Sequence, residues 1–175
     1  MLNDLPFGPL ERALVDSLQR LDPAASPVVL ASAALLCMAL DKGDVCLPLV
    51  RLAGQRPWPE QDFRLPALAD WQVQLQASLL VGGDGDFTPL ILEHGRLYLA
   101  RYQAYERQLA TQLLQRADDL PAVDEAQLSE SLTRLFAFNA QQPDWQRLAA
   151  AQAVRRKLAV ISSSPAAPAP AKPPP

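Results

Sequence analysis

The most apolar segment of the chain reads Ser26-Pro-Val-Val-Leu-Ala-Ser-Ala-Ala-Leu-Leu-Cys-Met-Ala-Leu40. Ser26 is a favourable N-cap, and Pro27 takes the first helical position, where its missing N–H costs nothing. Side chains on nearly every face of this helix are apolar, so we expect it to be the central helix of the core, with Cys37 packed inside. It is too short to cross a membrane, because a spanning helix needs roughly 20 residues.

Amphipathic segments surround this helix along the chain. Leucines at helical spacing predict a helix over 9–21. Further helices are expected near 66–79, 102–117, 124–136 and 145–156, and short strands near 45–47, 90–92, 97–99 and 158–161. The strands over 90–92 and 97–99 flank His94-Gly95 and predict a hairpin. Residues 55–62 and 81–86 are expected to be loops. The predicted fold class is mainly α with a small β component (α+β).

Composition excludes several classes of function. The chain has 175 residues, with 16 basic and 19 acidic side chains and a net charge of −3. A protein that grips nucleic acid directly needs an excess of Lys and Arg to neutralise phosphates, so that class is disfavoured. A single histidine excludes multi-histidine metal sites. Two cysteines without a C-x-x-C spacing predict reduced thiols and a cytoplasmic location.

Few residues suggest chemistry. His94 beside Glu93 is a candidate general base, although a turn residue next to Gly95 is the favoured interpretation. Asp84 and Asp86 form a candidate cation site but offer too few ligands, which favours a solvated loop. The basic run 155–157 has two interpretations: it contacts phosphate, or it complements the negative end of the last helix. The second interpretation is favoured by about two to one.

The last residues differ in composition from the rest. Six of the 17 prolines lie between Pro165 and Pro175. Proline removes backbone donors, and this tract has no large apolar side chain, so it cannot join a core. We therefore expect three regions: an N-terminal helical and hairpin domain over 1–120, helices and a strand over 121–162, and a disordered Pro/Ala-rich tail over 163–175.

Three segments carry a resemblance to a known family: GDVCLPL at 43–49, PLILEHGRLYLARY at 89–102 and DWQRLAAAQAVRRKLAVIS at 144–162. Together they resemble the N-terminal part of the alpha subunit of exodeoxyribonuclease V, the RecD subunit of the RecBCD complex. The resemblance spans residues 5 to 162.

That resemblance implies an ATP- and magnesium-dependent DNA helicase subunit, which works with a RecB-like beta subunit and a RecC-like gamma subunit on double-strand DNA ends during recombinational repair. The N-terminal domain is implied to dock on the gamma subunit. Gln146 matches the adenine-contacting glutamine of the family, and the strand over 158–161 is implied to lead into the phosphate loop of the motor domain.

The sequence departs from the family directly after that strand. The family continues Gly-Gly-Pro-Gly-Thr-Gly-Lys-Thr-Thr-Thr, whereas this chain has no glycine after Gly95 and places prolines in the corresponding positions. Prolines lack the N–H donors that wrap phosphates. We therefore expect this chain alone to use no cofactor or metal, to have no catalytic residue, and to leave Gln146 non-functional. A frameshift near residues 163–166 is our explanation of the tail, since the family loop read one base later encodes Ala-Pro-Ala-Pro-Ala-Lys-Pro-Pro.

Two functions remain open. The favoured one is a RecD-like fragment that docks on the gamma subunit without a working motor and reaches DNA only through the complex. The alternative is a stand-alone helical adaptor whose proline-rich tail binds partners. Trp58 and Phe87 are candidates for an interface, although core packing or loop anchoring is the favoured role of each.

Overall fold

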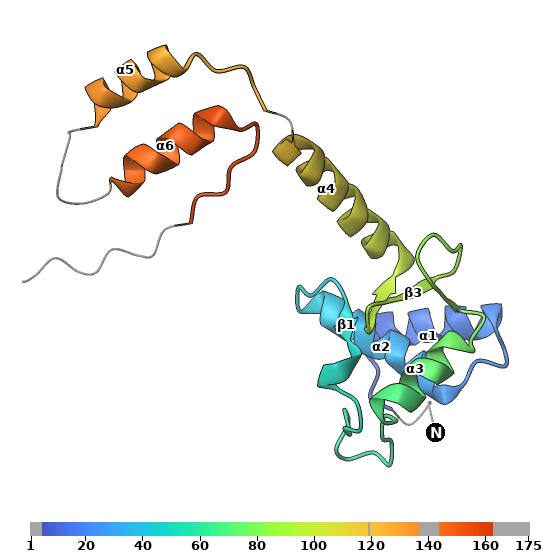
Figure 1. Cartoon of the computed structure of the whole chain (residues 1–175). Helices are drawn as coiled ribbons and strands as arrows, with labels where there is room; N and C mark the ends of the chain where they lie inside the picture. The colour runs from blue at the N-terminus through green and yellow to red at the C-terminus, as the bar shows by residue number, and fades with distance from the viewer. Residues whose placement is uncertain (1–4, 119, 137–143, 163–175) are drawn as a thin grey trace, which may run out of the picture. The chain divides into compact units, whose positions relative to one another are not determined.

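The computed structural model describes residues 5–118, 120–136 and 144–162. Contacts divide the chain into two units, residues 1–108 and 109–175, with the boundary inside a long helix. The elements in chain order are α1 (Pro9–Leu21), α2 (Pro27–Asp41), β1 (Leu47–Pro48), η1 (Leu49–Arg51), α3 (Leu68–Gln76), β2 (Val81–Gly82), β3 (Leu90–Glu93), β4 (Arg96–Leu99), α4 (Ala100–Asp118), α5 (Glu125–Leu135) and α6 (Trp145–Arg155) (Figure 1).

Helix α2 is the centre of the first unit, as its all-round apolar sequence predicts. Every residue from Val29 to Cys37 is buried, and α2 contacts α1, α3, β1 and β4 (Figure 1). The Ser26 hydroxyl accepts a hydrogen bond from the Val29 N–H at 3.3 Å, which confirms the predicted cap. Burial on all sides explains why the segment carries no polar face.

A short mixed sheet packs beside these helices, with the strand order β1-β4-β3-β2. Strands β3 and β4 form the predicted antiparallel hairpin. His94 (φ 49°) and Gly95 (φ 71°) both take positive φ at its turn, as a two-residue type I′ turn requires. Strand β2 runs parallel to β3, with Val81 opposite Leu90. The segment 83–89 therefore returns the chain from the end of β2 to the start of β3.

The second unit contains a helix pair. Asp124 caps α5 and Asp144 caps α6, each through its carboxylate, as the sequence predicts. A small apolar cluster joins the two helices: Leu128, Leu132 and Ala151, with Val123, Phe136 and Ala150 packed against it. This cluster is much smaller than the core around α2.

Four of the sequence predictions are wrong in detail. Strand β1 is Leu47–Pro48 rather than 45–47, and α3 ends at Gln76, so Leu79 lies beyond it and is exposed. Val81–Gly82, expected within a loop, is a strand because it pairs with β3. The expected buried strand over 158–161 is absent, and Val160 and Ile161 are exposed, because no described strand pairs with them.

The described part of the chain thus has mainly α structure with a small β component, as predicted. Within these residues, no helix is both long enough and apolar enough to span a bilayer. The proposed tail over 163–175, including the positions that correspond to a phosphate loop, lies outside the described residues.

Candidate functional site

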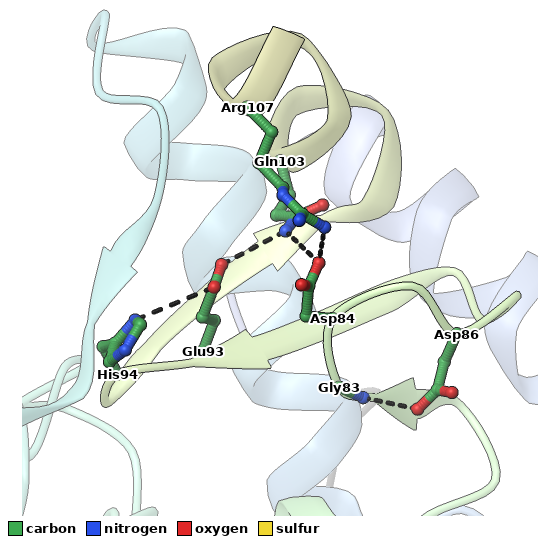
Figure 2. Close-up of polar contacts among 7 residues, drawn as sticks. All are labelled: Gly83, Asp84, Asp86, Glu93, His94, Gln103 and Arg107. Atoms are coloured by element: carbon green, nitrogen blue, oxygen red, sulfur yellow. Dashed lines mark hydrogen bonds and ion pairs between the residues drawn. The ribbon is translucent and has the colours of Figure 1, made fainter. Parts of the chain in front are cut away.

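A buried glutamine at the start of α4 organises the polar contacts of the first unit. Gln103 is 6% exposed, and its Nε2 donates to Asp84 Oδ1 at 3.2 Å and to Glu93 Oε2 at 3.1 Å. Arg107 forms an ion pair with the same Asp84 carboxylate. Figure 2 shows these four side chains, which we call the Gln103 cluster. Both amide hydrogens of Gln103 are therefore used.

The placement of three elements brings these side chains together. Gln103 and Arg107 are four residues apart, so they share one face of α4. Helix α4 begins directly after β4, and the Ala100 N–H donates to the Pro89 carbonyl at 3.0 Å. Glu93 is the last residue of β3. The Gln103 cluster therefore ties α4 to the hairpin and to the segment between β2 and β3.

The segment 83–89, which we call the β2–β3 loop, has its own internal bonds. The Asp86 carboxylate accepts from the Gly83 N–H at 2.7 Å (Figure 2). The Asp86 N–H in turn donates to the Gly83 carbonyl at 3.2 Å. A Cβ on Gly82 would lie 2.5 Å from Thr88 Oγ1, so the close approach at the base of the loop needs glycine. Phe87, in contrast, is fully exposed.

The structure favours the turn interpretation of His94. Its side chain is 85% exposed, and its Nδ1 lies 3.8 Å from Glu93 Oε1 (Figure 2). The neighbouring carboxylate is already bound by Gln103. His94 thus has the exposure and the positive φ of a turn residue, and the structure gives it no enclosed position in which to act as a general base.

Asp84 and Asp86, the candidate cation ligands, both have partners within the chain. Asp84 is bound by Gln103 and Arg107, and Asp86 caps the backbone of its own loop. Within the described residues, no group of three or more His, Cys, Asp or Glu side chains is placed to hold a metal ion. Both aspartates are exposed, as a solvated loop predicts, but each also fixes the loop conformation.

The basic run at 155–157 has a partner on the neighbouring helix. Arg155 makes a two-point contact with Glu125, from Nε to Oε1 at 2.9 Å and from Nη2 to Oε2 at 2.5 Å. This hydrogen bond is the main reason that the pKa of Glu125 is lowered and the pKa of Arg155 is raised. Arg155 therefore links α6 to the start of α5, a role that neither sequence interpretation included.

Gln146 lies in the first turn of α6 and is exposed. An open groove of about 330 Å³ beside α5 and α6 is lined by other residues: Leu120, Pro121, Val123, Glu125, Gln152, Arg155 and Arg156. That Gln146 matches the adenine-contacting position of the family, yet is non-functional in this chain, stays a prediction.

The predictions for the aromatic side chains and for Cys37 agree with the structure in part. Trp58 packs in the core, with ring centroids 5.5 Å from Phe7 and 5.7 Å from Phe63, which confirms core packing. Loop anchoring by Phe87 is wrong, because its side chain is fully exposed. Cys37 is buried as expected, and burial is the main cause that raises its pKa.

Sequence reasoning missed Gln103. It is a polar residue on a helix whose periodic apolar positions, such as Tyr105 and Leu109, suggested the buried face, yet these two are more than half exposed. Gln103 donates to two carboxylates that precede it in the sequence by 19 and 10 residues and lie on a loop and a strand. A single sequence carries no signal for that arrangement.

A comparison with models of protein families finds a match that lies within the first unit. Residues 6–98 match the family model described as the N-terminal domain of RecD, a subunit of the RecBCD enzyme. The match covers more than half of the chain and includes both the core around α2 and the β2–β3 loop. No curated protein matches the chain.

Proposed function

We propose that this chain, which belongs to the family of RecD N-terminal domains, docks on the other subunits of a RecBCD enzyme, and that its 175 residues do not themselves bind ATP. Family membership makes it a RecD-like subunit of RecBCD, or exodeoxyribonuclease V, and places it in DNA repair and recombination. The observation that carries the proposal is the family match over residues 6–98, which lies within the unit that has its own core.

The main partner in this proposal is the RecC-like gamma subunit, with the RecB-like beta subunit completing the complex. The family belongs to a multisubunit enzyme, and a domain with a core of its own can present a fixed surface to such partners. A net charge of −3 supports contact with DNA only through the complex, because direct binding requires neutralisation of phosphates. We expect this assembly in the cytoplasm.

The absence of nucleotide binding is the second part of the proposal, and it rests on the sequence. Polyphosphate is held by consecutive backbone N–H groups, a lysine and a hydroxyl in a glycine-rich loop. After Ile161 the chain continues Ser-Ser-Ser-Pro-Ala-Ala-Pro-Ala-Pro and contains no glycine. We therefore expect no ATP hydrolysis by these 175 residues, whatever the position of Gln146.

A retention experiment tests the docking part. The tagged full chain is mixed with purified RecC and RecB of the same organism, and we expect it to retain RecC. Failure to retain either subunit, with the circular dichroism of a folded helical protein, would contradict docking. If deletion of residues 163–175 abolishes retention, the proline-rich adaptor is the better explanation. Binding of a fluorescent ATP analogue in the presence of Mg²⁺ would overturn the second part.

A further inference from the structure

We infer that the β2–β3 loop is part of the docking surface and inserts Phe87 into an apolar pocket, rimmed by basic side chains, on a partner subunit. This inference rests on the proposed function and specifies which surface of the chain carries it. It commits to a protein partner rather than to DNA or to a second copy of this chain.

The first argument is the contrast between a fixed loop and an exposed aromatic ring. The loop is held by Asp86 at its own backbone, by Asp84 at α4, and by the close packing of Gly82 against Thr88. None of these contacts involves Phe87, which is fully exposed. The loop therefore keeps its conformation without the ring, and the ring is presented to solvent.

A fixed, exposed aromatic residue suits the centre of an interface. Aromatic side chains in desolvated pockets dominate the binding energy of many complexes, and the surrounding contacts mainly exclude water. Binding costs less when the loop is already ordered before association. Both conditions hold at Phe87, because the ring is large and apolar and the loop around it is hydrogen-bonded.

The second argument is charge. Between Arg64 and Arg96 the sequence contains no lysine or arginine, whereas Asp84, Asp86 and Glu93 all lie in or beside the β2–β3 loop. Arg107 contacts Asp84, and Arg96 lies opposite Glu93 in the hairpin, so these two arginines offset part of this charge and leave that of Asp86 at the loop itself. An acidic surface repels phosphates, which disfavours DNA as the occupant. It attracts a pocket with a basic rim, and such complementarity accelerates association.

The test compares single substitutions in the full chain. Phe87→Ala is expected to weaken binding to the purified RecB and RecC subunits roughly 30-fold, as removal of a central aromatic contact does. Phe87→Trp, which retains an aromatic ring, is expected to keep most of the affinity. The matched control is Leu79→Ala, because Leu79 is 82% exposed and precedes β2 outside the loop. The thermal unfolding midpoint should not change in Phe87→Ala, since the loop bonds do not use the ring.

The outcomes separate this inference from the proposed function. If the wild-type chain binds neither subunit, both fail. If wild type binds and Phe87→Ala binds equally well, the inference alone is overturned. If the wild-type chain associates with itself and Phe87→Ala removes this self-association, the pocket lies on a second copy of the chain. That result would also overturn the inference. An association rate that does not fall as NaCl is raised would contradict the basic rim.

Discussion

At the scale of single residues, one buried polar contact stands out in the core. The fully buried Trp71 donates from Nε1 to Ser32 Oγ at 2.8 Å, and Ser32 donates to the Val28 carbonyl at 2.6 Å. Ser32 is the one hydroxyl within the buried part of α2, and this contact joins α2 to α3. A buried donor without an acceptor costs about 1–3 kcal/mol, so the serine allows the indole to be buried.

Ser32→Ala is therefore expected to lower the free energy of unfolding by about 1–3 kcal/mol, because it leaves the Trp71 N–H without its acceptor. Denaturant titration followed by tryptophan fluorescence measures this loss. Ser17→Ala is the matched control, since the half-buried Ser17 makes the same backward hydrogen bond to the Ala13 carbonyl at 2.7 Å in α1, and its hydroxyl also accepts from the exposed Arg20 at 3.1 Å. We expect the control to stay within about 0.5 kcal/mol of wild type. Equal losses in the two variants would show that the Trp71 contact contributes nothing.

At the scale of elements, the turn of the hairpin gives a direct test of the role of His94. Its positive φ is unfavourable for most side chains and is better tolerated by asparagine. His94→Asn is expected to raise the free energy of unfolding by a few tenths of a kcal/mol, and His94→Val to lower it by about 1–2 kcal/mol. Thermal and denaturant unfolding of both variants check this order. Equal stability of the two variants would contradict the turn interpretation.

The contact between α5 and α6 predicts a pH dependence. The Arg155 side chain lowers the pKa of Glu125 in the folded state, so this contact stabilises the protein above the ordinary glutamate pKa. The contribution is lost as the pH falls through the lowered pKa. The thermal unfolding midpoint of Glu125→Gln should therefore lie slightly below that of wild type at neutral pH. In acid the two midpoints should be equal. The effect is small, because exposed ion pairs contribute little.

Circular dichroism melts of the full chain across this pH range measure the difference. Glu130→Gln serves as the control on the same helix, because the contact with Arg155 is made by Glu125. A difference between Glu125→Gln and wild type that persists unchanged into acid would show that the ion pair is not its cause.

Elements with local signals could be predicted from the sequence, and those that depend on distant partners could not. The caps at Ser26, Asp124 and Asp144 and the periodic leucines of α1 gave correct helices because each acts within one or two turns. The two-residue strand β2 has no periodic pattern, and only pairing with β3 makes it a strand. The apolar run 158–161 has the composition of a strand but no described partner.

The candidate site follows the same division. The turn at His94 could be predicted because Gly95 beside it is a local signal, and the structure confirms it. The Gln103 cluster and the fixed conformation of the β2–β3 loop could not, because they join side chains from α4, β3 and the loop. The exposure of Phe87 likewise could not be predicted, because it depends on the conformation of the loop around it.

At the scale of the whole molecule, family membership and local structure support one account. The chain is a RecD-like subunit by its match over residues 6–98, and the matched unit has its own apolar core. The candidate general base His94 and the candidate cation ligands Asp84 and Asp86 have structural roles: His94 lies in a turn, and the two aspartates hold a loop.

The most direct test of docking uses sedimentation velocity on a mixture of the full chain with purified RecC. The measured quantity is the mass of the species that forms. We expect a single faster boundary whose mass equals one copy of each protein, and the same boundary with or without ATP and Mg²⁺. Two separate boundaries at micromolar concentrations of both folded proteins would contradict the account.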